Sequence, residues 1–447
     1  MNIILLSGGS GKRLWPLSNE VRAKQFLKLL PNQENALESM IQRVYRQIHE
    51  ADLNAQVLIA TGLTQGEQIA NHLGNKVELV IEPERRNTFT AILLSCQYLL
   101  LKKGYSENDI VLVLPVDPYT DLSYFHMLKS MEEIVQQGKS EIVLMGITPT
   151  YPSTEYGYIV PHLNNSQAHV YEVARFEEKP SEANAQMLIQ QGGLWNAGVF
   201  AFKLGFIKAL ADHYLEGCQT YEDIFNQYAN LPETSFDYEV LEKTSSISMI
   251  HYDGVWKDLG TWNSLTEAMK TTAYGNVIFA EDNHGTHVIN ELDIPILVTG
   301  AENMVVVASP DGILVSSKDS STHIKSYVDK INMRSMYEEK RWGYYKILNH
   351  FQHSDGSQTL IKRLTVNAGF SISYQSHQLR SEVWTVIEGC GSLVLNGAKG
   401  DIKRGDVVNI RDNIKHTVHA IDKLTIIEVQ MGTELLETDI EKWEWVW

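Results

Sequence analysis

The first residues that could carry chemistry form a glycine-rich segment close to the N-terminus. A short apolar run, Ile3 to Leu6, leads directly into the segment Ser7-Gly8-Gly9-Ser10-Gly11-Lys12-Arg13. Glycines let the backbone turn tightly and bring its N–H groups to phosphate oxygens, and the two adjacent cations add positive charge. The segment therefore predicts a phosphate-binding loop. A plain glycine-rich turn between a strand and a helix is the alternative for so short a motif.

The spacing of this segment matches neither of two common nucleotide-binding motifs. The Walker pattern would need a glycine where Leu6 stands and a Ser or Thr where Arg13 stands. The dinucleotide fingerprint would place its third glycine on Leu14. What distinguishes the segment is its continuation, Leu14-Trp15-Pro16-Leu17-Ser18, followed by Lys24-Gln25-Phe26-Leu27.

Together, these segments resemble the signature of bacterial mannose-1-phosphate guanylyltransferases, within the sugar-1-phosphate nucleotidyltransferase superfamily. Further matches follow in the family's order and extend the resemblance over roughly the first 270 residues. They are Glu82-Pro83 with Arg86-Asn87-Thr88, Asp117 in VLPVDP, Tyr156-Gly157-Tyr158-Ile159, Phe176-Glu177-Glu178-Lys179-Pro180, Trp195-Asn196-Ala197-Gly198, Phe236-Asp237-Tyr238 and the stretch from Trp256 to Trp262. The ordered set is far more specific than any one motif.

The resemblance implies a reaction in which a sugar 1-phosphate attacks the α-phosphorus of a nucleoside triphosphate and pyrophosphate leaves. Negative charge accumulates at every step, so such catalysis depends on positioning and on cations, usually Mg²⁺ held by one or two carboxylates. By the resemblance, Asp117 and Asp258 are catalytic and hold Mg²⁺, and Arg13 and Lys24 complete the catalytic set. A turn or a helix cap is the common alternative for a single Asp after a strand. The remaining implied roles are nucleotide binding by Gly8, Gly9, Gly11, Lys12, Glu82, Arg86 and Asn87, and sugar-phosphate binding by Gly157, Glu178, Lys179 and Asn196.

The sequence departs from the family pattern at two places beside the predicted site. The usual run of a small residue, Asp and His is Val116-Asp117-Pro118 here, and the usual Pro before the KQFL lysine is Ala23. These departures leave the choice of sugar and nucleotide open. Guanine needs acceptors for its N1–H and amino group and a donor for its O6, and the segment that carries Glu82, Arg86 and Asn87 offers both kinds.

The region from Arg341 to the end resembles the cupin domain that carries phosphomannose isomerase activity in bifunctional relatives. Those relatives contain a Q-x-H-x-H-R-x-E-H-W stretch and a later His, which bind a divalent metal such as zinc. Here His377, Glu382 and His416 match ligands, but Leu379 and Val383 replace two histidines. Because loss of an imidazole removes a metal bond, a structural or dimerising barrel without a metal is the first expectation. A metal-binding isomerase is the alternative.

The expected elements explain how the first group of residues could meet. Apolar, strand-sized runs alternate with amphipathic stretches, which predicts an α/β, Rossmann-like nucleotidyltransferase domain with a mixed, mostly parallel sheet. Ligands of such sheets bind beyond the carboxyl ends of the strands, so residues after Leu6, Ile81 and Leu114 are expected at the site. The expected strands are Ile3–Leu6, Val57–Ala60, Val77–Ile81, Ile110–Leu114 and Ile142–Met145, and the expected helices are Glu34–Ile48, Thr64–Leu73 and Thr88–Leu101.

Later segments change to short β-rich stretches separated by turn residues. We expect three domains: the nucleotidyltransferase domain over 1–272, a small β-rich connector over 273–332 and an all-β cupin barrel over 333–447. A left-handed β-helix is one form that the connector could take. Since cupin barrels often pair, a homodimer is expected.

Composition excludes several function classes. The 447 residues include 38 Lys and Arg against 55 Asp and Glu, and this net charge of −17 argues against nucleic acid or an anionic membrane as a partner. The three cysteines form no CxxC pair, the apolar runs are strand-sized, and no basic leader precedes an apolar core. These features predict a cytoplasmic protein.

The preferred functional prediction is a Mg²⁺-dependent enzyme that converts GTP and mannose 1-phosphate into GDP-mannose and pyrophosphate, for the synthesis of surface polysaccharides. One alternative keeps the reaction but changes the sugar 1-phosphate or the nucleotide. A second is mannose-6-phosphate isomerisation through the cupin domain. A third is a non-catalytic module that binds an effector.

Overall fold

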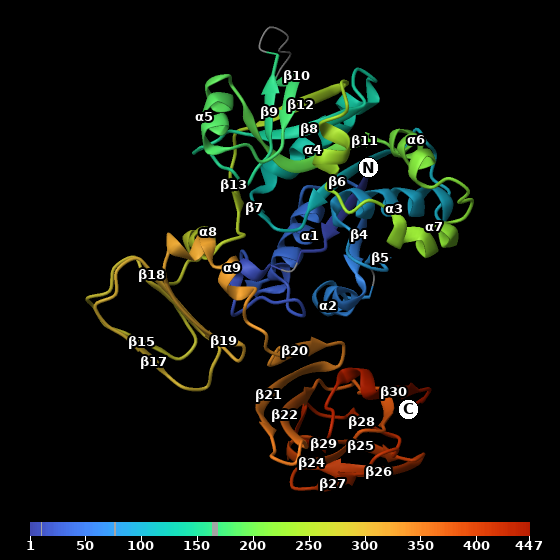
Figure 1. Ribbon diagram of the computed structural model, residues 1–447, viewed down its shortest axis with the longest axis vertical. Helices are drawn as coiled ribbons and strands as arrows, with labels where there is room; N and C mark the ends of the chain where they lie inside the picture. The colour runs from blue at the N-terminus through green and yellow to red at the C-terminus, as the bar shows by residue number, and fades with distance from the viewer. Residues whose placement is uncertain (10, 76, 163–168) are drawn as a thin grey trace. The chain divides into compact units, whose positions relative to one another are not determined.

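The computed structural model describes residues 1–9, 11–75, 77–162 and 169–447 (Figure 1). The chain divides into two compact units. Unit 1 comprises Met1–Leu14 and Ala23–Lys270, and unit 2 comprises Trp15–Arg22 and Thr271–Trp447. Unit 2 therefore combines the expected connector and the expected barrel. It also includes the eight residues Trp15–Arg22 near the N-terminus. The three-domain division at 272 and 332 stays a prediction.

Unit 1 is built on a nine-stranded mixed sheet in the order β5-β4-β1-β6-β11-β8-β12-β10-β9. Strands β5, β4, β1 and β6 run parallel, and β11 runs antiparallel to both of its neighbours, β6 and β8. The predicted mixed, mostly parallel sheet is thus confirmed. The strands of the unit are β1 (Asn2–Ser7), β2 (Leu30–Pro31), β3 (Leu37–Glu38), β4 (Gln56–Gly62), β5 (Glu78–Glu82), β6 (Ile110–Pro115), β7 (Pro118–Thr120), β8 (Ile142–Ile147), β9 (Tyr158–Pro161), β10 (Val170–Glu177), β11 (Leu194–Lys203), β12 (Ile247–Tyr252) and β13 (Trp256–Asp258).

Helices cover both faces of this sheet. Because successive strand residues point to opposite faces, Ile3 and Leu5 join one core with α1 and α4, whereas Ile4 joins a second core with α3 and α6. Burial on both faces explains why the central strands are continuous apolar runs. The helices are α1 (Met40–Glu50), α2 (Leu63–Leu73), α3 (Asn87–Leu101), α4 (Leu122–Gln136), α5 (Glu182–Gln190), α6 (Leu204–Tyr214), α7 (Tyr221–Gln227) and α8 (Trp262–Ala268).

The helix expected over Glu34–Ile48 begins later than predicted. Ser39 caps α1 through a reciprocal pair of hydrogen bonds with Gln42, so the helix starts at Met40. The preceding residues form the short antiparallel pair of β2 and β3 instead. The capping serine was not recognised in the sequence because the helical spacing continues backward past it.

Unit 2 contains the connector strands and the barrel. In the connector, β14, β16 and β18 pair in parallel, and so do β15 and β17. Strands that alternate between two parallel sheets along the chain are the arrangement of a β-helix. The antiparallel strand β19 closes the larger of these two sheets. The elements are β14 (Ala273–Tyr274), β15 (Val277–Phe279), β16 (His287–Asn290), β17 (Ile296–Val298), β18 (Met304–Ser309), β19 (Gly312–Ser317) and α9 (Lys325–Val328).

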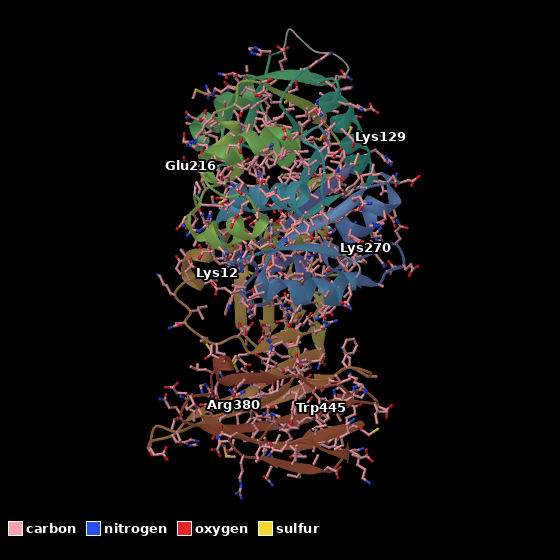
Figure 2. All side chains as sticks on the ribbon, turned by 90° about the vertical axis from the view of Figure 1, so that its right-hand side faces the viewer. Lys12, Lys129, Glu216, Lys270, Arg380 and Trp445 are labelled. Carbon is pink, nitrogen blue, oxygen red and sulfur yellow. The ribbon has the colours of Figure 1, made fainter. Side chains whose placement is uncertain are left out.

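The barrel consists of a six-stranded sheet, β20-β21-β22-β29-β24-β27, and a five-stranded sheet, β26-β25-β28-β23-β30. Its core includes Trp384, Leu360 and Val418, and side chains fill the interior of each unit (Figure 2). The strands are β20 (Tyr337–Lys340), β21 (Gly343–Gln352), β22 (Gln358–Val366), β23 (Tyr374–His377), β24 (Arg380–Glu388), β25 (Cys390–Leu395), β26 (Ala398–Lys403), β27 (Val407–Ile410), β28 (His416–Ala420), β29 (Leu424–Gly432) and β30 (Ile440–Trp443). The described part of the chain contains no helix that is both long and apolar enough to cross a bilayer.

Candidate active site

The glycine-rich segment lies where β1 ends, as expected for a ligand loop of an α/β sheet. Gly11 has a φ of +65°, and a Cβ at this position would lie 2.6 Å from Cβ of Lys24. Any other residue would strain the backbone and collide with Lys24. Gly8 and Gly9 are exposed, so the loop presents its backbone to the surface. Gly11 therefore brings the loop and the KQFL segment into direct contact.

A network of hydrogen bonds from buried polar side chains holds the backbone of this loop. Gln25 donates to Ser7 Oγ at 3.3 Å and to Gln65 Oε1 at 3.2 Å, and Gln65 donates to the carbonyl oxygen of Gly9 at 3.3 Å. Thr61 donates to the carbonyl oxygen of Ser7 at 2.9 Å. Neither Gln65 nor Thr61 was predicted, because a glutamine in a helix and a threonine in a strand carry no spacing signal.

Asp117 and Asp258 lie beside each other on a two-stranded ribbon. Strand β7 follows Asp117, and β13 ends with Asp258, which pairs with Pro118 in the antiparallel register. The ammonium group of Lys24 lies 2.5 Å from Asp117 Oδ2 and 3.7 Å from Asp258 Oδ1. Burial opposes the charge of Lys24, but the two carboxylates raise its pKa above the usual value, so the ammonium stays protonated.

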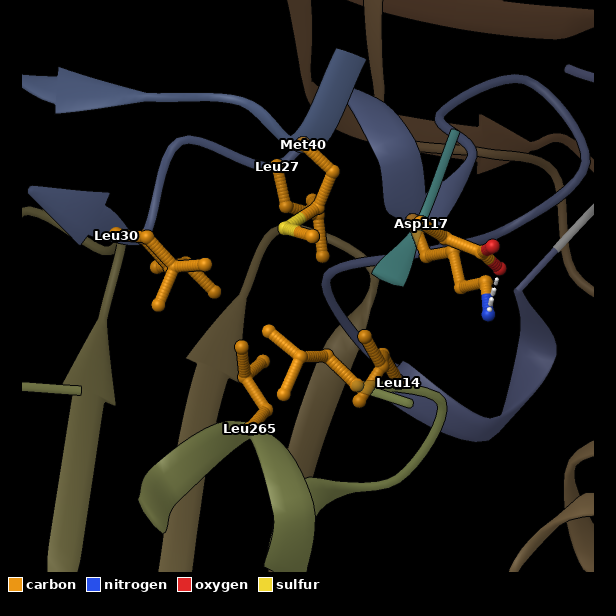
Figure 3. Close-up of a pocket in the computed structure, with 9 residues that line it drawn as sticks. Leu14, Leu27, Leu30, Met40, Asp117 and Leu265 are labelled. Atoms are coloured by element: carbon orange, nitrogen blue, oxygen red, sulfur yellow. Dashed lines mark ion pairs between the residues drawn. The ribbon is translucent and has the colours of Figure 1, made fainter. Parts of the chain in front are cut away.

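This arrangement tests whether the residues could hold a divalent cation. Two carboxylates converge on one positive charge, and carboxylate oxygens are the ligands that Mg²⁺ prefers in proteins. The donor set therefore fits the predicted metal. Figure 3 shows the other side of Asp117, where a small apolar pocket lies among Leu14, Leu27, Leu30, Met40 and Leu265. Such apolar walls lower the local dielectric and strengthen the interaction between Lys24 and the carboxylates.

A second pocket, with a cavity volume of about 190 Å³, is lined by both aspartates and by three of the four predicted sugar-binding residues, Gly157, Glu178 and Asn196, whereas Lys179 is not among its lining residues. Asn196 Nδ2 donates to Asp237 Oδ1 at 2.8 Å, and Lys179 Nζ lies 2.9 Å from Glu178 Oε1. A Cβ at Gly157 would lie 2.4 Å from Glu178 Oε2, so only glycine leaves room for this carboxylate. The lining residues are Pro115, Asp117, Pro118, Glu155, Tyr156, Gly157, Glu178, Asn196, Ala197, Gly198, Asp237, Trp256 and Asp258.

Asp237 belongs to this pocket, although no role was assigned to it from the sequence. Burial raises its pKa, and the nearby Glu178 raises it further, while Asn196 and Lys179 oppose the shift. Two carboxylates in one buried pocket favour the retention of a proton. Asp237 belongs to the family-like motif Phe236-Asp237-Tyr238, which could have drawn attention to it. An aspartate outside a known catalytic spacing does not by itself indicate a chemical role.

Aromatic rings form one wall of the same pocket. The ring of Tyr156 lies 4.9 Å from that of Trp195 and 5.6 Å from that of Trp256. Arg13 reaches the same region, because its guanidinium donates to Glu155 Oε2 at 2.7 Å. Flat apolar rings beside carboxylates and amides are suited to a sugar, which has both hydroxyl groups and apolar C–H faces.

The three residues predicted to select the base are largely occupied by protein contacts. Arg86 donates to the carbonyl oxygen of Leu231 at 2.7 Å, and Asn87 accepts from the backbone of Thr88 at 2.8 Å at the start of α3. Glu82 is buried, accepts from Tyr228 at 2.8 Å and lies near Gly8. Burial raises the pKa of Glu82. Their nucleotide role, like that of the half-buried Lys12 at the loop, stays a prediction.

In the barrel, His377, Glu382 and His416 form a buried cluster whose ligand atoms all lie within 4.8 Å of one another. His377 Nε2 is 3.1 Å and His416 Nε2 is 3.6 Å from the Glu382 carboxylate. Neither Nε2 makes a hydrogen bond within the described structure, whereas His416 Nδ1 is fixed by the carbonyl of Ile414 at 2.8 Å. Buried ring nitrogens that make no hydrogen bond and face a carboxylate fit a divalent metal, with Ile414 orienting one ligand.

The two residues that replace histidines lie outside this cluster. Leu379 is 46% exposed, whereas His377 and Glu382 are almost fully buried. Val383 follows Glu382 directly on β24, so its side chain points to the opposite face of the sheet. Leu379 therefore does not line the buried group, and whether the barrel holds a metal without a histidine at this position stays a prediction.

Two family models match separate parts of the chain. Residues 2–274 match the nucleotidyl transferase family, and residues 329–445 match the C-terminal domain of mannose-6-phosphate isomerase. The first match covers more than half of the chain. The chain belongs to the nucleotidyl transferase family and is an enzyme of that class.

Curated relatives match this chain over nearly its whole length. Mannose-1-phosphate guanylyltransferase of Salmonella muenchen is 30% identical over 99% of this chain and 97% of its own length. The enzyme of the same name from Klebsiella pneumoniae is 29% identical over 98% and 97%, respectively. A solved structure from Thermus thermophilus, described as a mannose-1-phosphate geranyltransferase, covers 74% of this chain and 98% of its own, with 30% identity and a TM-score of 0.60.

Proposed function

We propose that the chain forms GDP-mannose and pyrophosphate from GTP and mannose 1-phosphate. The observation that carries the proposal is the convergence of Asp117 and Asp258 on the ammonium of Lys24, beside the pocket that both aspartates line together with Glu178 and Asn196. The names of the full-length relatives support the choice of substrates.

The reaction forms one P–O bond and breaks another. An oxygen of the sugar phosphate attacks the α-phosphorus of the nucleotide, and the bond to the β-phosphate breaks as pyrophosphate leaves. The attacking phosphate oxygen is already anionic, so no general base is required. Lys24 and Arg13 supply positive charge near the reacting phosphates, and the backbone N–H groups of the glycine loop orient the triphosphate.

Asp117 and Asp258 would hold Mg²⁺, which offsets the charge of the phosphates when it is bound. Glu178 and Asn196 would hold sugar hydroxyl groups, and Lys179 would hold the sugar phosphate. The aromatic wall that includes Trp256 excludes water from one side of the hexose. The predicted homodimer and cytoplasmic location remain proposals that rest on the sequence.

A panel of nucleoside triphosphates against sugar 1-phosphates, with pyrophosphate release as the signal, tests this proposal. GTP with mannose 1-phosphate should give the highest kcat/KM. Asp117→Asn should abolish turnover while the melting temperature stays close to that of the wild type. The control is Asp253→Asn, which changes an exposed aspartate near β13 and should leave kcat/KM unaltered. Full activity of Asp117→Asn would remove the proposed metal carboxylate.

The buried cluster of the barrel favours a second candidate function, metal-dependent isomerisation of mannose 6-phosphate. His377, Glu382 and His416 are held by β23, β24 and β28 and would bind a divalent metal. Arg380, which is also almost fully buried, donates to Glu382 Oε1 at 3.1 Å and so orients this proposed ligand. Metal analysis of the full chain and an assay for fructose 6-phosphate decide this point. A metal-free barrel without turnover would leave it a structural domain.

A further inference from the structure

The segment from Trp15 to Arg22 is the part of the N-terminal signature that the proposed reaction does not use. It separates Gly11 and Arg13 from Lys24, yet its contacts place it in unit 2. The two ends of this excursion meet within unit 1, where Gly11 packs against Lys24. The chain thus leaves unit 1 directly after the predicted phosphate-binding loop and returns directly before the predicted catalytic lysine.

Apolar and backbone contacts hold the first half of the excursion. A Cβ at Gly312 would lie 2.6 Å from the indole ring of Trp15, so the ring packs on bare backbone at the start of β19. Ser309 donates to the carbonyl oxygen of Pro16 at 2.8 Å. Leu17 is completely buried. This degree of packing is that of a core segment rather than of a surface loop.

Polar contacts fix the turn in the second half. Asn19 Oδ1 accepts from the backbone N–H groups of Val21 at 2.8 Å and Arg22 at 2.7 Å. Its Nδ2 donates to Asp311 Oδ2 at 2.7 Å. The other oxygen of Asp311 accepts from the backbone of Met336 at 2.5 Å. Asp311 therefore ties the excursion to the start of the barrel.

An ion pair closes the excursion directly before it returns to unit 1. The guanidinium of Arg22 donates to both carboxylate oxygens of Glu291, at 2.8 and 2.9 Å. The guanidinium carbon of Arg22 lies 5.0 Å from the ring centre of Tyr337. Arg22 is 14% exposed and Glu291 is 21% exposed. A bidentate, partly buried pair of this kind fixes orientation as well as distance.

We propose that Glu291 and Asp311 are positioning residues for nucleotidyl transfer, because they hold residues 15–22 in one conformation and thereby set the placement of Gly11 and Lys24. This inference rests on the proposed function of unit 1. Lys24 is the second residue after Arg22, so only Ala23 separates the ion-paired residue from the predicted catalytic lysine. A misplacement of reacting groups by about 1 Å can lower a rate about 100-fold.

Glu291→Gln keeps the shape of the side chain and removes its charge. We expect kcat for pyrophosphate release to fall about 10- to 100-fold, with less than a twofold change in KM for mannose 1-phosphate. The matched control is Asp293→Asn, since Asp293 is 86% exposed and its carboxylate is 3.9 Å from Arg363. This control should behave as the wild type. The exchanged pair, Arg22→Glu with Glu291→Arg, should recover a measurable part of kcat.

Hydrogen exchange followed by mass spectrometry gives a readout that does not depend on activity. In free Glu291→Gln, the amides of residues 8–14 and 23–27 should exchange faster than in the wild type, while those of Asp293→Asn should not. Asp311→Ala should show the same acceleration if the glutamine variant folds poorly. Unchanged exchange in both variants, or wild-type kcat in a folded Glu291→Gln, would overturn the proposal. If the wild type lacks transferase activity, the proposed function fails, and the exchange rates still decide whether Glu291 positions the loop.

Discussion

The placement of Lys24 between two carboxylates predicts that this lysine competes with a metal ion in the free enzyme. Lys24 Nζ lies within 3.7 Å of both Asp117 and Asp258. Lys24→Met removes the ammonium and keeps a side chain of similar length. The variant should therefore bind Mn²⁺ more tightly than the wild type in the absence of nucleotide, even though its kcat falls.

The size of this effect follows from the charges. Unit charges about 4 Å apart interact by about 1 kcal/mol in water and by about 4 kcal/mol near a protein surface. The side chains of Lys24, Asp117 and Asp258 are 17%, 30% and 33% exposed and an apolar pocket adjoins them, so the value for water is a lower bound. Repulsion between the ammonium and a doubly charged ion then costs at least about 2 kcal/mol, which corresponds to about 30-fold in affinity.

Titration of the free enzyme with Mn²⁺, followed by electron paramagnetic resonance of the unbound ion, measures this affinity directly. Lys24→Arg keeps the charge and should bind Mn²⁺ as the wild type does. Asp258→Asn should weaken Mn²⁺ binding both in the wild type and in Lys24→Met. Equal or weaker Mn²⁺ binding by Lys24→Met would refute the reasoning, because the carboxylates would then not form the metal site.

Three further predictions concern the loop, the sugar pocket and the barrel. Gly11→Ala should lower kcat by about 10- to 100-fold, measured by pyrophosphate release, because its Cβ would displace Lys24. The folded pKa of Asp237 is raised by burial and by Glu178, so its contribution to stability is present at acid pH and is lost as the pH rises through the raised value. Melting temperatures between about pH 4 and pH 8 should therefore show the wild type losing stability relative to Asp237→Asn, and parallel curves would contradict this. His377→Ala should lower the zinc content from about one ion per chain to nearly none, and a wild type without metal after zinc exposure would exclude the site.

The central strands could be predicted from the sequence because burial on both faces makes them continuous apolar runs. The run from Ile3 to Leu6 lies within β1, and Ile142–Met145 lies within β8. Helix α3 begins one residue before its predicted start at Thr88. The start of α1 was missed, since the cap at Ser39 outweighs a helical spacing that extends further back.

The site residues could be predicted only where they belong to motifs that occur in the order of the family. Asp117 and Asp258 are distant in sequence, and only the ordered motifs suggested that they meet. Gln65 supports the loop through an amide whose role depends on the tertiary fold. The exposure of Leu379 could not be predicted, because a sequence motif does not show which of its positions face inward.

The assignment of residues 15–22 to unit 2 has a consequence for how this protein can be divided. No single cut of the polypeptide separates the two units, since a fragment ending at Lys270 keeps Leu17 and Arg22 but lacks Glu291 and Asp311. A chimeric protein that takes unit 2 from another chain therefore keeps these contacts only if residues 15–22 are exchanged together with residues 271–447.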